Sequence, residues 1–463
     1  MNFLAMAEER KNELIQGLKQ LIQIESVLDE ENAREDAPFG EGPKKALEWM
    51  LSTASKDGFQ VKNVDHYAGH IEMGEGEDIL GILCHVDVVP AGGNWTYPPF
   101  EGTVKDGKLY GRGAIDDKGP TMAAYLAMKM VRDAGIPLSK RVRMIIGTDE
   151  ESGFRCVEHY FQKEEMPGIG FAPDADFPLI NAEKGIALLE FSQTSPLSQD
   201  EQLLSFKAGN RNNMVPDFAE AVLKNVPSGF EEKFHQYFRQ YDEEVAFNRE
   251  GDRVIISVTG KSAHAMEPEK GKNAAVILAQ FLNLLLTTEA SKAFVSFLDD
   301  VFSDVYGKAL GLDYADEMSG PTTLNAGIVT FDLENGGNII VSMRYSVTYP
   351  YEEKMRMAQE NLAKYPFALN VVSNSEPHYI PEDDELIQTL LNVYRRYTND
   401  DTKPLSTGGG TYARALKKGV AFGSLFPGEP DVAHQKDEYV VIDNLVKAAA
   451  IYAEAIVELA CKK

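Results

Sequence analysis

The stretch Ile79-Leu80-Gly81-Ile82-Leu83-Cys84-His85-Val86-Asp87-Val88-Val89-Pro90 gives the clearest indication of the fold. Its first six residues form a short apolar run, which is typical of a buried β-strand. The run leads directly into His85 and Asp87, two side chains that can bind or orient a metal ion. In α/β proteins, functional side chains gather where buried strands end. The stretch therefore predicts an α/β fold with a functional site at one edge of its sheet.

The segments around this strand predict a doubly wound α/β layer. Residues 118–133 place Met122, Tyr125, Leu126 and Met130 on one helical face, and residues 142–147 form a second apolar run. A buried strand, a helix and a second buried strand indicate a mostly parallel sheet covered by helices. The end of the chain has the same alternation of apolar strands and amphipathic helices, with helices expected at 385–397 and 445–460 and a strand at 420–425.

The length of the chain and the change in its pattern of strands and helices predict two domains. A chain of 463 residues exceeds the size at which a single hydrophobic core usually stops growing. Its middle part alternates strands with long helices in an α+β manner, with strands expected at 254–259, 339–343 and 368–372. We therefore expect an α/β catalytic domain of residues 1–182 and 380–463, interrupted by a large inserted α+β lid domain of residues 183–379.

Composition narrows the classes of partner. The chain has 46 basic and 72 acidic residues, a formal net charge of −26, so phosphate backbones and anionic bilayers would repel it. We expect neither a nucleic-acid partner nor a membrane partner. The first residues lack the basic start and apolar run of a signal peptide, and the three cysteines form no CxxC pair. These features favour a cytoplasmic protein.

Metal-ligand side chains follow four of the predicted strands or strand-like segments. They are His85 and Asp87 after residues 79–84, Asp116 and Asp117 after 109–115, Asp149, Glu150 and Glu151 after 142–147, and Asp174 and Asp176 after 170–173. Mixed imidazole and carboxylate ligands suit zinc, with cobalt or manganese as substitutes. The acidic groups outnumber the needs of one ion. We therefore expect a bridged pair of ions about 3.5–4 Å apart.

The spacing of the ligand-type residues within these segments suggests that neighbouring side chains have different roles. Asp87, two residues after His85, is placed to hold the second nitrogen of the imidazole. Glu150 and Glu151 are adjacent and cannot point the same way on a strand, so one can bind metal while the other acts as general base. Asp176 competes with Asp174 as the metal-binding carboxylate of its loop, and we prefer Asp174.

Three motifs together resemble a known family of enzymes. They are His85-Val86-Asp87-Val88-Val89-Pro90, Gly111-Arg112-Gly113 followed by Asp116-Asp117-Lys118-Gly119, and Asp149-Glu150-Glu151-Ser152-Gly153. This combination resembles the two-zinc metallopeptidase family, which includes aminoacylase, desuccinylase, glutamate carboxypeptidase, carnosinase and bacterial dipeptidases. The resemblance to the bacterial dipeptidases extends along nearly the whole chain.

The resemblance implies a role for each metal-site residue. His85 and Asp174 would complete one zinc site, and Glu151 and His434 the other. Asp116 would bridge the two ions, and the peptide bond that follows it, Asp116–Asp117, would be cis, as is common in the family. Glu150 would act as general base, with Asp87 supporting the catalytic group.

The resemblance also implies a substrate-binding set. His264 would stabilise the oxyanion, while Asn213 and Arg344 would hold the substrate's carbonyl and carboxylate. The backbone amides of Gly409 and Gly410, in the loop Gly408-Gly409-Gly410-Thr411, would approach the same end. We assign the free amine of the substrate to Asp117. The large insert resembles a lid that replaces a partner subunit, so we expect a monomer.

These inferences converge on a di-zinc dipeptidase acting on small peptides with a free N-terminus. Hydrolysis would proceed through a zinc-bound hydroxide, with Glu150 as base and His264 as oxyanion stabiliser. An N-acyl-amino-acid deacylase or desuccinylase on the same core is the nearest alternative. A catalytically inactive protein that binds metal or peptide is the alternative from another class.

Overall fold

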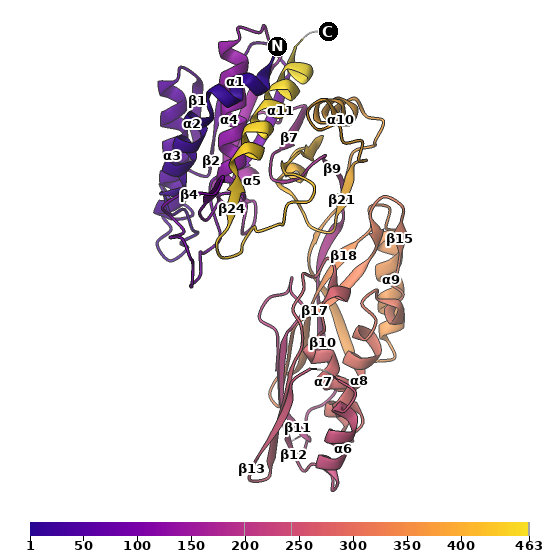
Figure 1. The fold of residues 1–463 in the computed structure, drawn as a ribbon. Coiled ribbons are helices and arrows are strands. Elements are labelled where there is room, and N and C mark those ends of the chain that lie inside the picture. The colour runs from indigo at the N-terminus through magenta and orange to yellow at the C-terminus, as the bar shows by residue number, and fades with distance from the viewer. Residues whose placement is uncertain (199, 242, 462–463) are drawn as a thin grey trace. The chain divides into compact units, whose positions relative to one another are not determined.

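The computed structural model describes residues 1–198, 200–241 and 243–461. The chain forms two compact units (Figure 1), called here unit 1 and unit 2. Unit 1 comprises Met1–Asn181, Ile380–Leu405 and Thr411–Lys463, and unit 2 comprises Ala182–Tyr379 and Ser406–Gly410. Each unit has a hydrophobic core of its own. Within the described ranges, no helix has the length and apolar character needed to cross a membrane.

The main sheet of unit 1 has a parallel centre. Its strand order is β1 (Gln60–Val64), β2 (Ala68–Met73), β6 (Arg141–Gly147), β3 (Ile79–His85), β7 (Ile169–Ala172) and β22 (Gly419–Ala421). The ladder continues through β9 (Ile180–Glu183), β20 (His378–Tyr379) and β21 (Leu405–Thr407), where the chain passes from one unit to the other. The pairs β6–β3, β3–β7 and β7–β22 are parallel, whereas β1–β2 and β2–β6 are antiparallel. The predicted α/β fold is confirmed.

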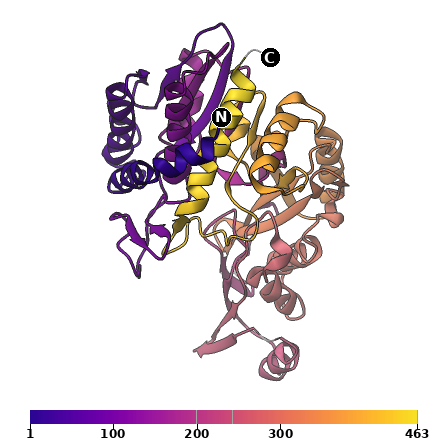
Figure 2. The ribbon, with the colours of Figure 1, turned by 45° about the horizontal axis from the view of Figure 1, so that its top comes forward.

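Helices cover both faces of this sheet, because successive residues of a buried strand point to opposite sides. Ile82 and Cys84 of β3 face one core, and Leu83 faces the other. The first core also contains α1 (Phe3–Glu9), α2 (Lys11–Ile22), α3 (Glu41–Lys56), α4 (Lys118–Asp133), α10 (Glu385–Thr398) and α11 (Ile442–Ala460). In Figure 1, α4 and α11 lie side by side, and Figure 2 shows α1 crossing α11. The second core contains α5 (Arg155–Lys163) and η3 (Tyr412–Ala415).

Most predicted elements of unit 1 are present, but one strand is divided. The helix expected at 118–133 has those bounds in α4. The strand expected at 420–425 is wrong as a single strand, because β22 ends at Ala421 and β23 (Ser424–Leu425) pairs with β8 (Ala175–Asp176). Gly423 between them has φ +77°, a left-handed conformation that favours glycine and ends the strand. A small antiparallel sheet of β4 (Thr103–Lys105), β5 (Lys108–Tyr110) and β24 (Tyr439–Val441) completes the unit.

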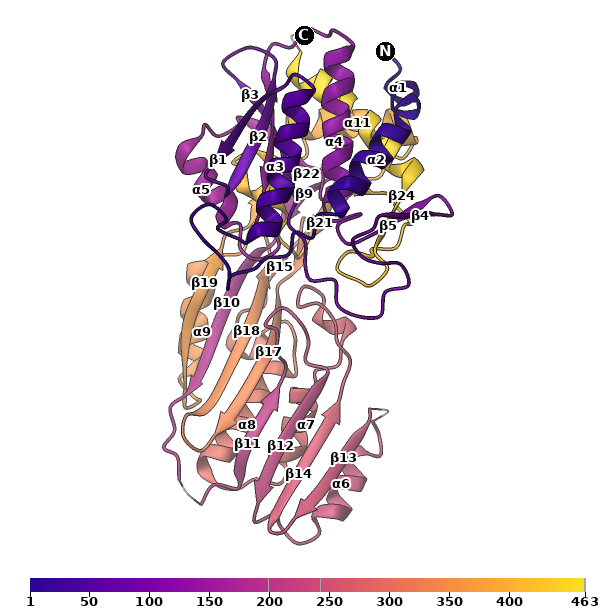
Figure 3. The same cartoon turned by 90° about the vertical axis from the view of Figure 1, so that its left-hand side faces the viewer.

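Unit 2 is a two-layer α+β structure built on one antiparallel sheet, seen from its face in Figure 3. The strand order is β13 (Val245–Glu250), β14 (Arg253–Thr259), β12 (Phe218–Lys224), β11 (Leu203–Ala208), β17 (Thr323–Asp332), β18 (Gly336–Tyr345), β10 (Gly185–Gln193) and β19 (Phe367–Ser375). Alternate residues of β10, β12 and β14 are buried, as expected for a sheet covered on one side. The covering helices are α6 (Phe230–Phe238), α7 (Ala274–Asn283), α8 (Glu289–Phe302) and α9 (Tyr351–Leu362).

The core of unit 1 provides a stability test. Phe171 on β7 is fully buried, and its ring centroid lies 5.7 Å from those of both Phe422 and Tyr452. We expect Phe171→Ala to lower the free energy of unfolding of unit 1 by about 4 kcal/mol, because it removes these contacts and leaves a cavity. The chain's two tryptophans, at positions 49 and 95, both lie in unit 1, so tryptophan fluorescence during urea unfolding reports on this unit.

The matched control is Val104→Ala on β4, whose side chain is exposed. This substitution should change the free energy of unfolding by about 0.5 kcal/mol or less. Equal losses in the two variants would contradict the assignment of Phe171 to the core.

Candidate metal centre

The candidate site lies at one edge of the parallel sheet in unit 1. His85 is the last residue of β3, Glu150 and Glu151 lie in the turn after β6, and Asp174 follows β7. Since β6, β3 and β7 are parallel neighbours, their carboxyl ends meet at the same edge. Asp116 comes from the loop before α4, and His434 from the loop between β23 and β24.

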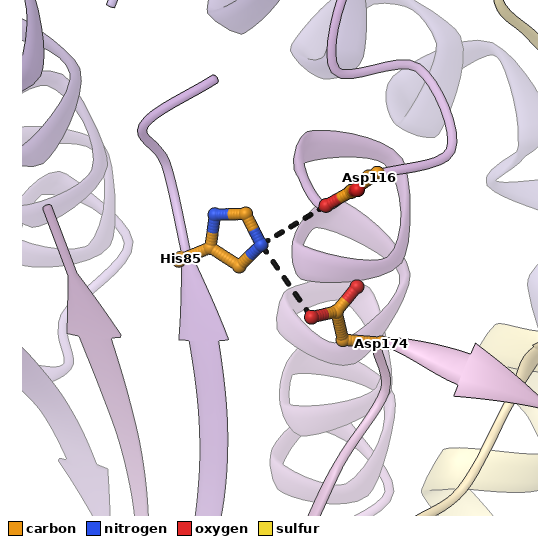
Figure 4. Close-up of side chains that lie close together, drawn as sticks. All are labelled: His85, Asp116 and Asp174. Carbon is orange, nitrogen blue, oxygen red and sulfur yellow. Dashed lines mark hydrogen bonds and ion pairs between the residues drawn. The ribbon is translucent and has the colours of Figure 1, made fainter. Parts of the chain in front are cut away.

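The first group of ligand-type side chains consists of His85, Asp116 and Asp174 (Figure 4). His85 Nε2 lies 3.1 Å from Asp116 Oδ1 and 3.5 Å from Asp174 Oδ2. His85 is fully buried, and each member offers one ligand atom within 4.8 Å of the others. This arrangement leaves one imidazole nitrogen and two carboxylate oxygens directed at a common point.

The second group consists of Asp116, Glu151 and His434. His434 Nε2 lies 2.9 Å from Glu151 Oε2 and 3.0 Å from Asp116 Oδ2. Asp116 thus presents Oδ1 to one imidazole and Oδ2 to the other. A carboxylate held in this way is suited to bridge two cations. The Asp116–Asp117 peptide bond is cis, as expected.

Asp87 contacts one residue of each metal-ligand group. Its side chain is buried, and Oδ1 lies 3.4 Å from His85 Nδ1. Its other oxygen, Oδ2, accepts a hydrogen bond of 3.1 Å from the backbone N–H of Glu151. The backbone carbonyl of Asp87 forms the hydrogen bond with His85 Nδ1, at 3.1 Å. Asp87 therefore orients the imidazole of the first group through its carbonyl and fixes the backbone of a residue in the second through its carboxylate.

Glu150 and Glu151 point to different groups. Glu150 Oε2 is 4.0 Å from His85 Nε2, whereas Glu151 contacts His434. Burial raises the pKa of the Glu150 carboxyl well above its usual range; His85 opposes this shift, and the negative charge of Asp174 adds to it. A carboxyl group with a raised pKa beside such a cluster is suited to accept and return a proton.

Asp149 was missed as a supporting residue, although it stands in the quoted motif. Its carboxylate accepts hydrogen bonds from the Arg155 backbone N–H at 3.2 Å, from Arg155 Nε at 2.7 Å and from the Ser152 hydroxyl. These contacts close the turn that presents Glu150 and Glu151. The two glutamates therefore diverge on a turn, not on the strand assumed from the sequence.

Asp117 occupies a different environment from its neighbour Asp116. Its side chain is fully buried, and Oδ2 accepts hydrogen bonds from the His85 backbone N–H at 3.1 Å and the Thr121 hydroxyl at 3.0 Å. These contacts anchor the end of β3. The predicted contact between Asp117 and a substrate amine finds no support in this placement, because the carboxylate has no exposed surface.

Unit 2 brings several of the predicted substrate-binding residues together. Arg344 on β18 donates a hydrogen bond of 3.2 Å to the carbonyl of Gly408. A Cβ on Gly408 would lie 2.7 Å from Met266 Cβ, so the glycine permits a close approach to that residue. The backbone N–H of Met266 in turn donates to His264 Nδ1 at 3.2 Å. The glycine loop thus links Arg344 to the His264 segment.

Asn213 lies beside the same segment. Its carbonyl accepts a hydrogen bond of 2.8 Å from the backbone N–H of Ala265, and Met214 forms an antiparallel bridge with His264. In the glycine loop, the Gly409 N–H donates to the Thr407 hydroxyl at 3.0 Å, and Gly410 follows it. The first of these two amides therefore already has a partner within the loop.

A buried ion pair that sequence reasoning missed fixes the loops of unit 1. Arg112 Nη1 lies 2.6 Å from Glu438 Oε2, and both side chains are almost fully buried. The other oxygen of Glu438 accepts from the backbone N–H groups of Ile115, at 3.0 Å, and Asp116, at 3.3 Å. Arg112 Nη2 also donates to the carbonyl of His434 at 3.4 Å. The pair therefore ties the Asp116 loop to the His434 loop.

Comparison with known proteins gives the family. Residues 81–458, more than half of the chain, match Peptidase family M20/M25/M40. The protein named "Putative dipeptidase YtjP" of Bacillus subtilis (strain 168) is 48% identical over 466 residues, covering 99% of this chain and 100% of that protein. "Putative dipeptidase SAR1836" of Staphylococcus aureus (strain MRSA252) is 42% identical over 460 residues, covering 98% of each. The structure of human carnosine dipeptidase 1 shares the fold, with a TM-score of 0.57 at 14% identity, covering 99% of this chain and 98% of that chain.

The fold, the clustered ligand-type residues and these matches define a metal-dependent peptidase. The chain belongs to peptidase family M20/M25/M40 and is a hydrolase of the metallopeptidase class. The family resemblance drawn from the three motifs is confirmed.

The Arg112–Glu438 pair provides a second stability test. We expect Glu438→Ala to lower the free energy of unfolding of unit 1 by about 3 kcal/mol, because it leaves a guanidinium buried without its counter-charge. Urea unfolding followed by tryptophan fluorescence measures the loss.

Glu458→Ala is the matched control, since it removes the Arg396–Glu458 contact, whose two side chains are 48% and 32% exposed. The cost of the control should stay below about 1 kcal/mol. A loss at Glu438 no larger than that of the control would refute the proposed anchoring of the two loops.

Proposed function

We propose that the chain is a di-zinc dipeptidase that hydrolyses dipeptides with a free N-terminus. The observation that carries the proposal is the placement of Asp116, whose two carboxylate oxygens face two different imidazole-containing groups. Each group combines one histidine with two carboxylates, a donor set suited to zinc, with cobalt or manganese as substitutes. We therefore assign His85, Asp116 and Asp174 to one ion and Asp116, Glu151 and His434 to the other.

The surroundings of these residues fit bound cations. Glu151 Oε1 is buried without a hydrogen-bond partner among the described residues. A buried acceptor in that condition costs roughly 1–3 kcal/mol, and a cation would remove the cost. The cluster also holds more carboxylates than the two histidines can neutralise, which favours ions of high positive charge.

Zinc, when bound, would polarise the scissile carbonyl and make the attacking water more acidic. Glu150 would accept the proton of that water at its carboxylate and return it to the leaving amine. Asp87 would hold His85 in one orientation throughout.

The residues of unit 2 would bind the substrate. Arg344, Asn213 and the glycine loop of Gly409 and Gly410 would hold its carboxylate and carbonyl, and His264 would stabilise the oxyanion. In this proposal residues 183–379 act as a lid, and the enzyme is a cytoplasmic monomer. The names of the two bacterial relatives, both of which begin "Putative dipeptidase", support the choice of substrate class.

Two alternatives make different predictions. A deacylase or desuccinylase would use the same core on an N-acyl amino acid. An inactive protein would bind metal or peptide without turnover.

We expect the zinc-loaded enzyme to cleave Ala-Ala but neither N-acetyl-Ala-Ala nor Ala-Ala-Ala, with loss of activity in the presence of a chelator. Chromatography that resolves free alanine, acetate and the remaining peptides distinguishes the three. Cleavage of the acetylated compound alone would favour the deacylase. Cleavage of none of the three compounds, despite bound zinc, would favour the inactive protein.

The role of Glu150 has its own test. We expect Glu150→Gln to keep about two zinc ions per chain by elemental analysis, while kcat falls about 10³-fold because the base is lost. The control is Glu158→Gln on α5, an exposed glutamate, which should keep normal kcat. A Glu150→Gln variant with near-normal turnover would refute the assignment of the base.

A further inference from the structure

Unit 2 contains a cavity that is lined by none of the residues assigned above to metal or substrate. Its volume is about 300 Å³, and its lining comes from α7, from the end of α8 and the residues after it, and from β17. Since a water molecule takes up about 30 Å³ in the liquid, the cavity has room for about ten groups of that size. It therefore fits a small organic molecule.

Part of the lining is apolar and belongs to the hydrophobic core of unit 2. Val276 and Ile277 come from α7, Phe302 ends α8, and Leu324 lies on β17. All four side chains are almost fully buried and pack within the same core, so their positions do not depend on a ligand. An apolar side chain of a ligand would be removed from water against them.

Asn325 on β17 is the polar feature that points to a ligand. The residue lines the cavity and is only 3% exposed. Its Nδ2 donates hydrogen bonds to the carbonyls of Met214, at 2.8 Å, and Asn212, at 3.3 Å. Its Oδ1 accepts no hydrogen bond from a described residue and still keeps accessible surface, which the cavity provides. Asn325 thus holds the two neighbours of Asn213 with one atom and offers an acceptor to the cavity with the other.

Two opposite charges lie side by side in the lining. The ammonium group of Lys272 contacts the carboxylate of Glu243, and their side chains are 52% and 8% exposed. An ammonium group has three donors, so Lys272 can keep this contact and also donate to a second carboxylate. The cavity therefore presents a negative charge, a positive charge and a neutral acceptor next to an apolar surface.

We infer that this cavity binds a free α-amino acid with an apolar side chain. The ammonium group of the amino acid donates to Asn325 Oδ1 and faces Glu243, its carboxylate accepts from Lys272, and its side chain lies against the apolar lining. The site is separate from the candidate metal centre, because the metal-ligand residues all belong to unit 1. A free amino acid is also the class of compound that hydrolysis of a dipeptide releases.

The lining favours an amino acid over simpler or larger ligands. A hydrocarbon would leave the acceptor of Asn325 without a donor, and a lone anion or cation would leave the apolar surface uncovered. No three ligand-type residues of the lining form a metal-ligand group among the described residues. A dipeptide with two apolar side chains has more non-hydrogen atoms than the cavity has room for.

The first test is calorimetry on the zinc-loaded full chain with leucine and close relatives of leucine. Leucine amide lacks the carboxylate, 4-methylpentanoic acid lacks the amine, and glycine lacks the apolar side chain. We expect the wild type to bind leucine at least about ten-fold more tightly than each of these compounds, because each loses one of the contacts.

Variants of the lining identify the site of binding. Lys272→Met should weaken leucine binding about ten-fold and leave binding of leucine amide within about two-fold, because only the carboxylate loses its partner. Gln280→Trp places a larger side chain at a half-buried lining position on α7 and should weaken leucine binding at least about ten-fold. The matched control is Lys270→Met, which should keep the affinity of the wild type. Lys270 is 63% exposed, pairs with Glu267 and does not line the cavity.

Two outcomes would overturn the inference. One is a wild type that binds no leucine at millimolar concentration. The other is leucine binding that is equally tight in the wild type, Lys272→Met and Gln280→Trp, which would place the amino acid at another site such as the metal centre.

Discussion

The candidate metal centre depends on one electrostatic constraint: carboxylates crowd around two imidazoles at the end of a parallel sheet, and the sheet has to hold them there. Burial raises the pKa of the Glu151 carboxyl to about 7, with the negative charge of Asp116 adding to the shift. Such carboxylates repel one another and lose hydration, so isolated side chains would not assemble in this way. The backbone holds these side chains together. The parallel strands β6, β3 and β7 end at the same edge of the sheet, so their side chains meet there even though the carboxylates repel one another. The sheet thus provides the stability that the site itself lacks.

Supporting residues turn this crowding into a defined geometry. Asp87 contacts a residue from each metal-ligand group, and Glu438 fixes the backbone of Asp116 while its partner Arg112 holds the loop of His434. These side chains are buried, and their hydrogen bonds hold the backbone of Glu151, Asp116 and His434. The arrangement is typical of metal enzymes, in which residues behind the ligands determine their orientation.

The sequence predicted what depends on local pattern. The apolar run of β3 and the helical periodicity of α4 are short-range signals, and the ligand-type residues at strand ends follow from the general geometry of parallel sheets. Other features had no local signal. Arg112 and Glu438 are 326 positions apart, so their pairing depends on the tertiary fold. Asp116 and Asp117 are chemically identical neighbours, yet one faces the metal-ligand groups and the other is buried against Thr121. The break at Gly423 was hidden within an apolar stretch, because a left-handed glycine leaves the hydrophobic pattern unchanged.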